Sequence, residues 1–234
     1  DKIIAISERI KDNLIKSGIN PEKIEYISDG VDLTEFQPNY SETNVLRIDF
    51  KLHDRLIGLV GRIEPFKRQK DFMPIIAEVI KKRQDVSFLL IGDILRKHDK
   101  YLRETIQAVR KYAIYNYVVF TGYRRDMPDV LNSLDILVTL SGGSVIMEAR
   151  ACETPVIMAD KSRQVNLIKD DGTGVLNVPD NISDLSEAIL HLLDDEDLRI
   201  KMGDSGRKRV ENLYDVRKTS ESTQQIYKSI LVRG

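Results

Sequence analysis

The sequence predicts an α/β protein in which a Rossmann-like parallel sheet is covered by helices on both faces. Two observations support this fold class. Short apolar runs alternate with longer segments of helical periodicity between residues 55 and 178, and several of these runs end at a glycine. Such runs are typical of strands buried on both faces of a parallel sheet, with the helical segments as crossovers. The pattern is clearest in Asp135–Asp160, where strand, glycine turn, helix and strand follow one another.

The predicted strands are short and apolar. They are Leu56–Val60, Val86–Ile91, Val118–Thr121, Ile136–Leu140, Thr154–Ala159 and Gly174–Val178. The helices between them carry apolar residues on one face, as Leu102, Ile106 and Val109 illustrate. They are Lys70–Arg83, Tyr101–Ala113, Met127–Leu134, Val145–Glu153 and a short helix around Val165–Lys169. We expect right-handed crossovers between the parallel strands.

The two ends of the chain differ from this middle part. Near the start, strands Ile3–Ile6 and Ile24–Ile27 flank a helix that Ser7 caps and Gly18 ends, and a turn at Asp29-Gly30 leads into a connector over Val31–Tyr40. The end is helical, with predicted helices at Leu185–Leu193, Glu196–Leu213 and Val216–Leu231. We place domain boundaries after residues 54 and 214, which gives the segments 1–54, 55–214 and 215–234. The opening DKIIAIS has the character of mid-strand sequence, so we expect the chain to be a fragment.

The composition limits the classes of function. The 234 residues allow one large domain or one domain plus part of another, and 41% hydrophobic residues can form a sizeable core. A net charge of −1 lacks the basic excess of nucleic-acid-binding proteins, and no apolar run approaches the ~20 residues of a membrane span. The single cysteine, Cys152, excludes an internal disulfide and fits a reducing compartment, so we expect a cytoplasmic protein. His53, His98 and His191 are scattered, and nothing has metal-ligand spacing.

Polar residues gather in three loops that follow predicted strands. The carboxyl ends of parallel strands meet at one edge of a sheet, where ligands bind. The first loop carries Arg62 and Lys67, and the third is the Gly142-Gly143 turn with Glu148 behind it. The second loop carries Tyr123, Arg124 and Arg125. Cations that converge on a helix N-terminus would hold a diphosphate, and a carboxylate beside it would accept hydrogen bonds from sugar hydroxyls. The three loops together therefore predict a nucleotide-diphosphate site.

Each of these residues also has an ordinary structural interpretation. Arg62 and Lys67 fit solvated loop cations, and Arg124 and Arg125 a solvated pair. Glu148 could serve only the helix dipole, and Gly142-Gly143 only a tight turn. Cys152, among small residues on a helix, fits a packed thiol better than a nucleophile. The joint placement of the loops, rather than any single residue, favours the binding site.

The sequence resembles the C-terminal, donor-binding half of the retaining, nucleotide-sugar-dependent glycosyltransferases with the GT-B fold, the "glycosyltransferases group 1" type. The loop GLVGRIEPFKRQKDF is similar to the family's Gly-Arg-x₄-Lys loop. Further similar segments follow in the family's order: FLLIGD, VVFTGYRRDMPDVLNSLDILVTLS, IMEARACETPVIMAD and DDGTGVLNVPDNISDLSEAI. The resemblance implies that residues 1–54 are the end of an N-terminal domain with its linking segment. It also implies that residues 55–214 bind the nucleotide sugar and that residues 215–234 form a helix that crosses back toward the N-terminal domain.

The resemblance implies a role for each matching position. Arg62 and Lys67 would bind the donor diphosphate and stabilise the leaving group, as the catalytic residues. The implied donor-binding residues are Gly61, Tyr123, Arg124, Gly142, Gly143, Ser144, Val145 and Glu148. In this set, backbone amides contact the phosphates or ribose, Glu148 holds the ribose hydroxyls, and Tyr123 and Arg124 border the base. We expect no metal and no separate cofactor, because the UDP- or GDP-linked sugar is the substrate and the two cations replace a metal.

The implied acceptor is a glycan, a lipid-linked molecule or a protein, bound through an N-terminal half, in cell-surface polysaccharide biosynthesis. Peripheral membrane contact stays open. The isolated chain is expected to be inactive.

The sequence departs from the family in two places. The family has two glutamates eight positions apart; Glu148 matches the second, but the first falls at Leu140, beside Ser141. The Gly-Gly-x-x-Glu stretch that follows the next strand corresponds here to Ser162–Asn166. The sugar contacts are therefore altered. This leaves open a non-catalytic nucleotide-binding or scaffold module derived from such an enzyme. A GT-B-fold sugar-nucleotide epimerase is a third alternative, which the Gly-Arg-x₄-Lys loop disfavours.

Overall fold

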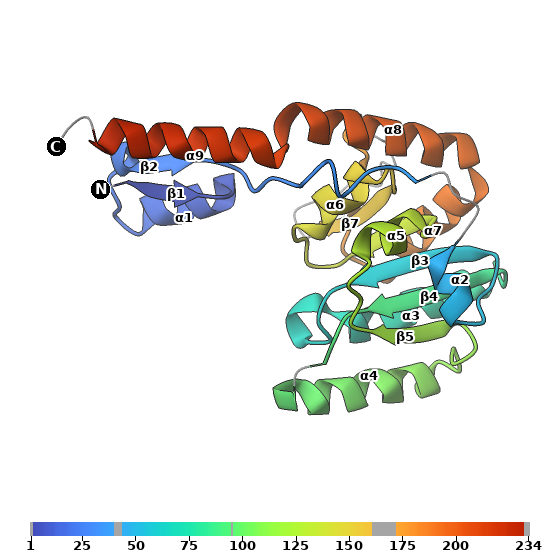
Figure 1. Cartoon of the computed structure of the whole chain (residues 1–234). Helices are drawn as coiled ribbons and strands as arrows, with labels where there is room; N and C mark the ends of the chain where they lie inside the picture. The colour runs from blue at the N-terminus through green and yellow to red at the C-terminus, as the bar shows by residue number, and fades with distance from the viewer. Residues whose placement is uncertain (1, 40–43, 95, 161–171, 232–234) are drawn as a thin grey trace.

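The computed structural model describes residues 2–39, 44–94, 96–160 and 172–231 (Figure 1). Its main body is a parallel sheet with the strand order β5-β4-β3-β6-β7-β8. The strands are β3 (Arg55–Val60), β4 (Val86–Ile91), β5 (Val118–Gly122), β6 (Ile136–Thr139), β7 (Val156–Asp160) and β8 (Val175–Pro179). The predicted parallel sheet is confirmed, and no strand end differs from its predicted position by more than two residues.

Helices cover both faces of this sheet. One face packs against α3 (Gln69–Ile80), α4 (Asp99–Lys111) and α7 (Ile182–Asp194). The other face packs against α2 (Val45–Asp49), α5 (Met127–Asn132) and α6 (Val145–Ala151). The α8 helix (Glu196–Leu213) packs beside α6. The apolar strand runs form the two cores because every residue of β4 is buried between these layers. The predicted Rossmann-like α/β class is therefore confirmed.

The N-terminal residues form a small unit beside the main sheet (Figure 1). It consists of β1 (Ile3–Ala5), α1 (Glu8–Lys16) and β2 (Ile24–Tyr26), with β1 and β2 paired in parallel. Ser7 caps α1 as predicted, since its hydroxyl accepts a hydrogen bond from the Ile10 N–H at 3.2 Å. The last helix, α9 (Val216–Leu231), extends from α8 along this unit (Figure 1).

Two chain segments connect the small unit to the sheet, and they are hydrogen-bonded to each other. The Val31 N–H donates to the Tyr214 carbonyl at 2.8 Å, and the Val216 N–H donates to the Val31 carbonyl at 3.1 Å. The Thr219 hydroxyl adds a bond to the Ser28 carbonyl at 3.1 Å. The connection is therefore a paired ribbon and not a single strand of chain.

One helix of the structure has no counterpart among the predicted elements, and one predicted helix lies outside the described residues. The α2 helix was not predicted, because five residues are too few to show a period. Its Leu46 is fully buried in the core of the main sheet, so packing with that sheet begins before the boundary predicted after residue 54. The predicted short helix around Val165–Lys169 lies outside the described residues.

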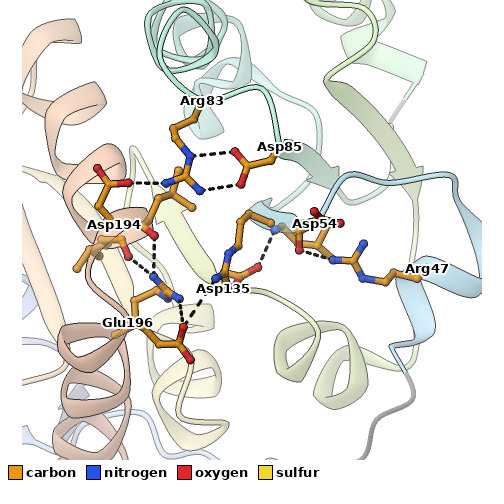
Figure 2. A network of polar contacts seen from close by, with 12 residues as sticks. Arg47, Asp54, Arg83, Asp85, Asp135, Asp194 and Glu196 are labelled. Carbon is orange, nitrogen blue, oxygen red and sulfur yellow. Dashed lines mark hydrogen bonds and ion pairs between the residues drawn. The ribbon is translucent and has the colours of Figure 1, made fainter.

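A network of ion pairs ties the amino edge of the sheet to the helical end of the chain (Figure 2). The Asp135 carboxylate accepts from the Arg55 guanidinium at 2.9 Å and from the Leu56 N–H at 2.8 Å. Arg83 pairs with Asp85 at 2.7 Å and also with Asp194 at the end of α7. The exposed pairs contribute little individually, but Asp135 joins β3 to β6 at their starts. This edge lies opposite the one that carries the predicted site.

Candidate functional site

The predicted loops lie at the switch point of the sheet. The chain runs outward from β3 through β4 to β5 and then returns to place β6 on the other side of β3. The carboxyl ends of β3 and β6 therefore diverge into loops above a shared crevice, where open α/β sheets bind ligands. The loop after β3 carries Arg62 and Lys67, and the turn after β6 carries Gly142 and Gly143.

Lys67 joins these two loops. Its ammonium Nζ donates to the Gly142 carbonyl at 3.3 Å, while its aliphatic stem covers Gly61. A Cβ at Gly61 would lie 2.9 Å from Lys67 Cδ, and a Cβ at Gly143 would lie 3.2 Å from Nζ. Glycine at both positions therefore lets the lysine approach. Burial lowers the pKa of the Lys67 ammonium from its ordinary value, while the charge of Glu64 acts in the opposite direction.

Arg62 extends from the same loop toward solvent. Its side chain is 60% exposed, and its Nη2 lies 3.3 Å from Oε1 of Glu64. The Glu64 side chain is only 11% exposed, and its other oxygen lies 3.4 Å from Nε2 of His98. The guanidinium thus has one fixed contact and an open outer side, which is free to meet an anion.

Two residues that sequence reasoning missed hold this loop in place. The Gln69 side-chain N–H₂ donates to the carbonyls of Arg62 at 2.8 Å and Gly61 at 3.3 Å. Arg68 donates from Nη1 to the Leu140 carbonyl at 3.1 Å and pairs with Asp180 at 2.9 Å. These contacts tie the loop after β3 to the ends of β6 and β8. The Arg68–Asp180 pair spans 112 positions, so no local pattern could have shown it.

The glycine turn after β6 adopts backbone angles that favour glycine, with φ of 71° at Gly142 and 130° at Gly143. The Gly142 N–H already donates to the Thr139 hydroxyl at 3.0 Å, so it is not free for a phosphate as the resemblance implied. Among the described residues, the N–H groups of Gly143, Ser144 and Val145 donate to no acceptor. Three of the four implied amides therefore stay available to a ligand.

Glu148 lies in the first turn of α6, half-buried, one turn after Ser144. Burial raises the pKa of its carboxyl above the ordinary value, the Ser144 hydroxyl lowers it, and the charge of Glu35 raises it further. This burial disfavours the charged carboxylate relative to the neutral acid. Hydroxyl donors from a ligand would relieve that cost.

A buried leucine, Leu140, occupies the position at which the family has its first glutamate. Leu140 is 4% exposed and belongs to the core cluster that includes Leu176 and Val178. It therefore supplies packing and a backbone carbonyl, not a polar side chain. The second departure, Ser162–Asn166, lies outside the described residues.

Tyr123 and Arg124 lie farther from this centre, after β5, which ends the sheet two strands away from β3. Tyr123 is 67% exposed. Arg124 is not solvated as its ordinary interpretation held, because its guanidinium pairs with Asp126 at 2.5 Å and with Asp49 of α2. The structure brings Arg62, Lys67 and the glycine turn together, but it gives Arg124 other partners. A contact of Tyr123 and Arg124 with a base stays a prediction.

Cys152 has the environment of a packed thiol. Its Sγ lies 4.0 Å from the Pro128 carbonyl, and burial raises the pKa of the thiol to about 12. At pH 8 the thiolate fraction should then be about a thousandfold below that of an unperturbed cysteine. We expect the native chain to resist an aromatic disulfide reagent and the urea-unfolded chain to react at once. Native labelling at the rate of free cysteine would contradict this environment.

The described residues contain neither a metal-ligand cluster nor a membrane-spanning helix. No group of three or more His, Cys, Asp or Glu among them is placed to hold a metal ion. No helix among them is long and apolar enough to cross a bilayer.

An open parallel sheet with cations and a glycine turn at its switch point places the chain among the α/β proteins that bind ligands at the carboxyl ends of their strands. A sequence profile of the family described as "Glycosyl transferases group 1" matches residues 42–209. The chain therefore belongs to the group 1 glycosyltransferases, as the resemblance indicated.

Individual relatives extend this result. The chain is 29% identical over 218 residues to a D-inositol 3-phosphate glycosyltransferase of Corynebacterium kroppenstedtii, covering 88% of this chain and 48% of the relative. It is 27% identical to the capsular polysaccharide biosynthesis glycosyltransferase CapM of Staphylococcus aureus, covering 98% and 62%. The chain thus spans about half to two thirds of the length of these curated relatives.

Solved structures share the fold. Anabaena HepE, in complex with UDP and glucose, has a TM-score of 0.85 at 23% identity, covering 97% of this chain and 63% of HepE. The C-terminal domain of the group 1 protein LpcC from Francisella tularensis has a TM-score of 0.69 at 25% identity. That match covers 80% of this chain and 100% of the LpcC domain.

Proposed function

We propose that the protein to which this chain belongs transfers a sugar, with retention, from a nucleotide-diphosphate sugar to a glycan, lipid or protein acceptor. The chain is the donor-binding half in this proposal. The transfer takes place in the cytoplasm, and a second domain binds the acceptor.

One observation supports this function above the others: Lys67 spans the switch point. Its ammonium meets the glycine turn after β6, while its loop also presents the exposed guanidinium of Arg62. Two cations on one loop, one of them in contact with a turn that has available N–H groups, fit a diphosphate, because both charges and amide donors match phosphate oxygens. Glu148, on the helix behind the turn, fits hydroxyl groups and not a phosphate.

The same arrangement suggests how transfer would be catalysed. When the bond between the sugar and the diphosphate breaks, negative charge grows on the departing phosphate oxygen. Fixed cations aimed at that oxygen lower the barrier, because they stabilise charge that the ground state has only in part. In the proposal Lys67 and Arg62 supply this stabilisation, and the acceptor attacks the face from which the diphosphate leaves.

The relatives support the choice of ligand and acceptor classes. HepE is described with UDP and glucose, and an Escherichia coli relative at 26% identity is a UDP-Gal:alpha-D-GlcNAc-diphosphoundecaprenol galactosyltransferase. CapM is named for capsular polysaccharide biosynthesis. We therefore propose a UDP- or GDP-linked donor and a role in cell-surface polysaccharide biosynthesis.

The first test is calorimetric titration of the chain with UDP, GDP and ADP. We expect one of them to bind at micromolar level, and Arg62→Ala to weaken it about tenfold or more, since a charge-assisted hydrogen bond contributes ~1.5–3 kcal/mol. Arg110→Ala, which removes the same charge from the exposed side of α4, is the matched control and should bind as the wild type does. If all three nucleotides fail to bind both the folded chain and the full-length protein, the proposal is wrong.

A second candidate is a non-catalytic nucleotide-binding or scaffold module. The buried Leu140 favours it, because the family's first glutamate has no counterpart at that position. Donor hydrolysis by the full-length protein separates the two candidates. Nucleotide binding without any turnover of UDP- or GDP-sugars would favour the module.

A further inference from the structure

Glu64 is an unexpected residue at an anion site. It lies two positions after Arg62 and three before Lys67, and its side chain is almost fully buried. A carboxylate beside a diphosphate would repel the ligand, and its burial is costly unless cations compensate. Its presence therefore needs a structural reason.

The two carboxylate oxygens of Glu64 have separate neighbours. Oε1 lies 3.3 Å from Nη2 of Arg62, and Oε2 lies 3.4 Å from Nε2 of His98. Within the described part of the chain, the buried His98 Nε2 has no hydrogen-bond partner of good geometry, which leaves the Glu64 oxygen as its neighbour. Glu64 thus lies between the exposed guanidinium of Arg62 and the buried Nε2 of His98.

The backbone around Glu64 is anchored on both sides. The Ile63 N–H donates to the Asp93 carbonyl at 2.9 Å, and the Glu64 carbonyl accepts from the Lys67 N–H at 3.0 Å. Arg62, by contrast, has a long side chain that is 60% exposed. The contact therefore joins an exposed, long side chain to a carboxylate that is buried on an anchored backbone, so we expect it to restrain the arginine.

We propose that Glu64 is a positioning residue for Arg62: it pairs with Nη2, leaves Nε and Nη1 free for phosphate oxygens, and itself lies against the His98 imidazole. The inference rests on the proposed function, because it assumes that Arg62 binds a diphosphate. A guanidinium oriented before the ligand arrives loses less rotamer entropy on binding.

The direction in which one substitution changes nucleotide affinity tests this role. Glu64→Leu removes a negative charge from beside an anion site, so a carboxylate without a positioning role predicts tighter nucleotide binding. Positioning predicts that Glu64→Leu weakens binding of the preferred nucleotide about three- to tenfold, since the arginine loses its restraint. Glu64→Gln keeps an oxygen acceptor for Arg62 and should bind within about twofold of the wild type, or more tightly.

The second test combines Glu64→Leu with Arg62→Ala in one double variant. With no guanidinium left to orient, Glu64→Leu should cause no further loss of affinity, so the two changes are non-additive. His98→Phe should weaken binding in the same direction as Glu64→Leu, and it serves as the test if Glu64→Leu does not fold. Glu104→Gln, which breaks the exposed pair with Lys70 at 2.8 Å, is the matched control and should leave affinity unchanged.

Three outcomes would overturn the inference: tighter binding by Glu64→Leu, equal loss by Glu64→Gln and Glu64→Leu, or additive losses with Arg62→Ala. Each of them requires that the wild type binds nucleotide. Failure of the wild type to bind would instead count against the proposed function, so the two failures are distinguishable.

Discussion

Lys67→Met is expected to weaken binding of the preferred nucleotide diphosphate by about 10- to 150-fold, the loss of one charge-assisted bond worth ~1.5–3 kcal/mol. Methionine keeps the apolar stem that covers Gly61, so the loop can retain its packing. What disappears is the ammonium between the Gly142 carbonyl and the crevice. The measurement is a calorimetric titration beside a thermal melt of the same variant.

Lys70→Met is the matched control for this experiment. Lys70 lies three positions after Lys67, in the first turn of α3, where its ammonium pairs with Glu104 and lies near the Tyr101 ring. The same loss of charge there should leave nucleotide affinity within about twofold of the wild type, because surface pairs contribute little. Equal losses in the two variants would mean that only net charge matters, and Lys67 would have no specific role.

Gly92→Ala is expected to lower the free energy of unfolding by about 2–6 kcal/mol, because backbone strain and overpacking each contribute roughly 1–3 kcal/mol. Gly92 has a φ of 150°, and a Cβ there would lie 2.3 Å from the Gly61 carbonyl oxygen. Its N–H donates to the Gly122 carbonyl at 3.0 Å, so it cannot move away without disturbing the end of β5. Urea unfolding of the wild type and the variant measures the difference.

Gly122→Ala separates the two contributions. Gly122 also has a positive φ, 73°, but a Cβ there would meet no atom within 4 Å. It should therefore show only the backbone strain, about 1–2 kcal/mol. If Gly92→Ala is no more destabilising than Gly122→Ala, the close approach of Gly92 to the loop of Arg62 is not rigid.

The sequence predicted the elements whose apolar pattern is long or fully buried. The ranges of β4 and α8 agree residue for residue, because burial on both faces or a sustained helical period marks their ends. The α2 helix was missed because its five residues depend on one buried side chain, Leu46, and on an Asn44 cap. Such short helices form through tertiary contacts and not through periodicity.

The site likewise has a part that sequence pattern predicts and a part that depends on tertiary contacts. A parallel sheet could be inferred from the alternation of strands and helices, so it was predictable that the Arg62–Lys67 loop and the glycine turn share one edge. The partners of these residues were not, since they come from other elements. Asp49 removes Arg124 from solvent, Asp180 fixes Arg68, and Thr139 occupies the Gly142 amide. A sequence indicates which groups a site contains, whereas their availability depends on contacts that only the folded chain makes.

The paired ribbon at Val31 and Tyr214–Val216 has a mechanical consequence. A single linker lets two bodies tumble, but two hydrogen-bonded segments resist twisting and separation while they still bend. The small N-terminal unit and α9 are therefore held to the main sheet through two chain segments that are bridged to each other at Val31 and Asp215.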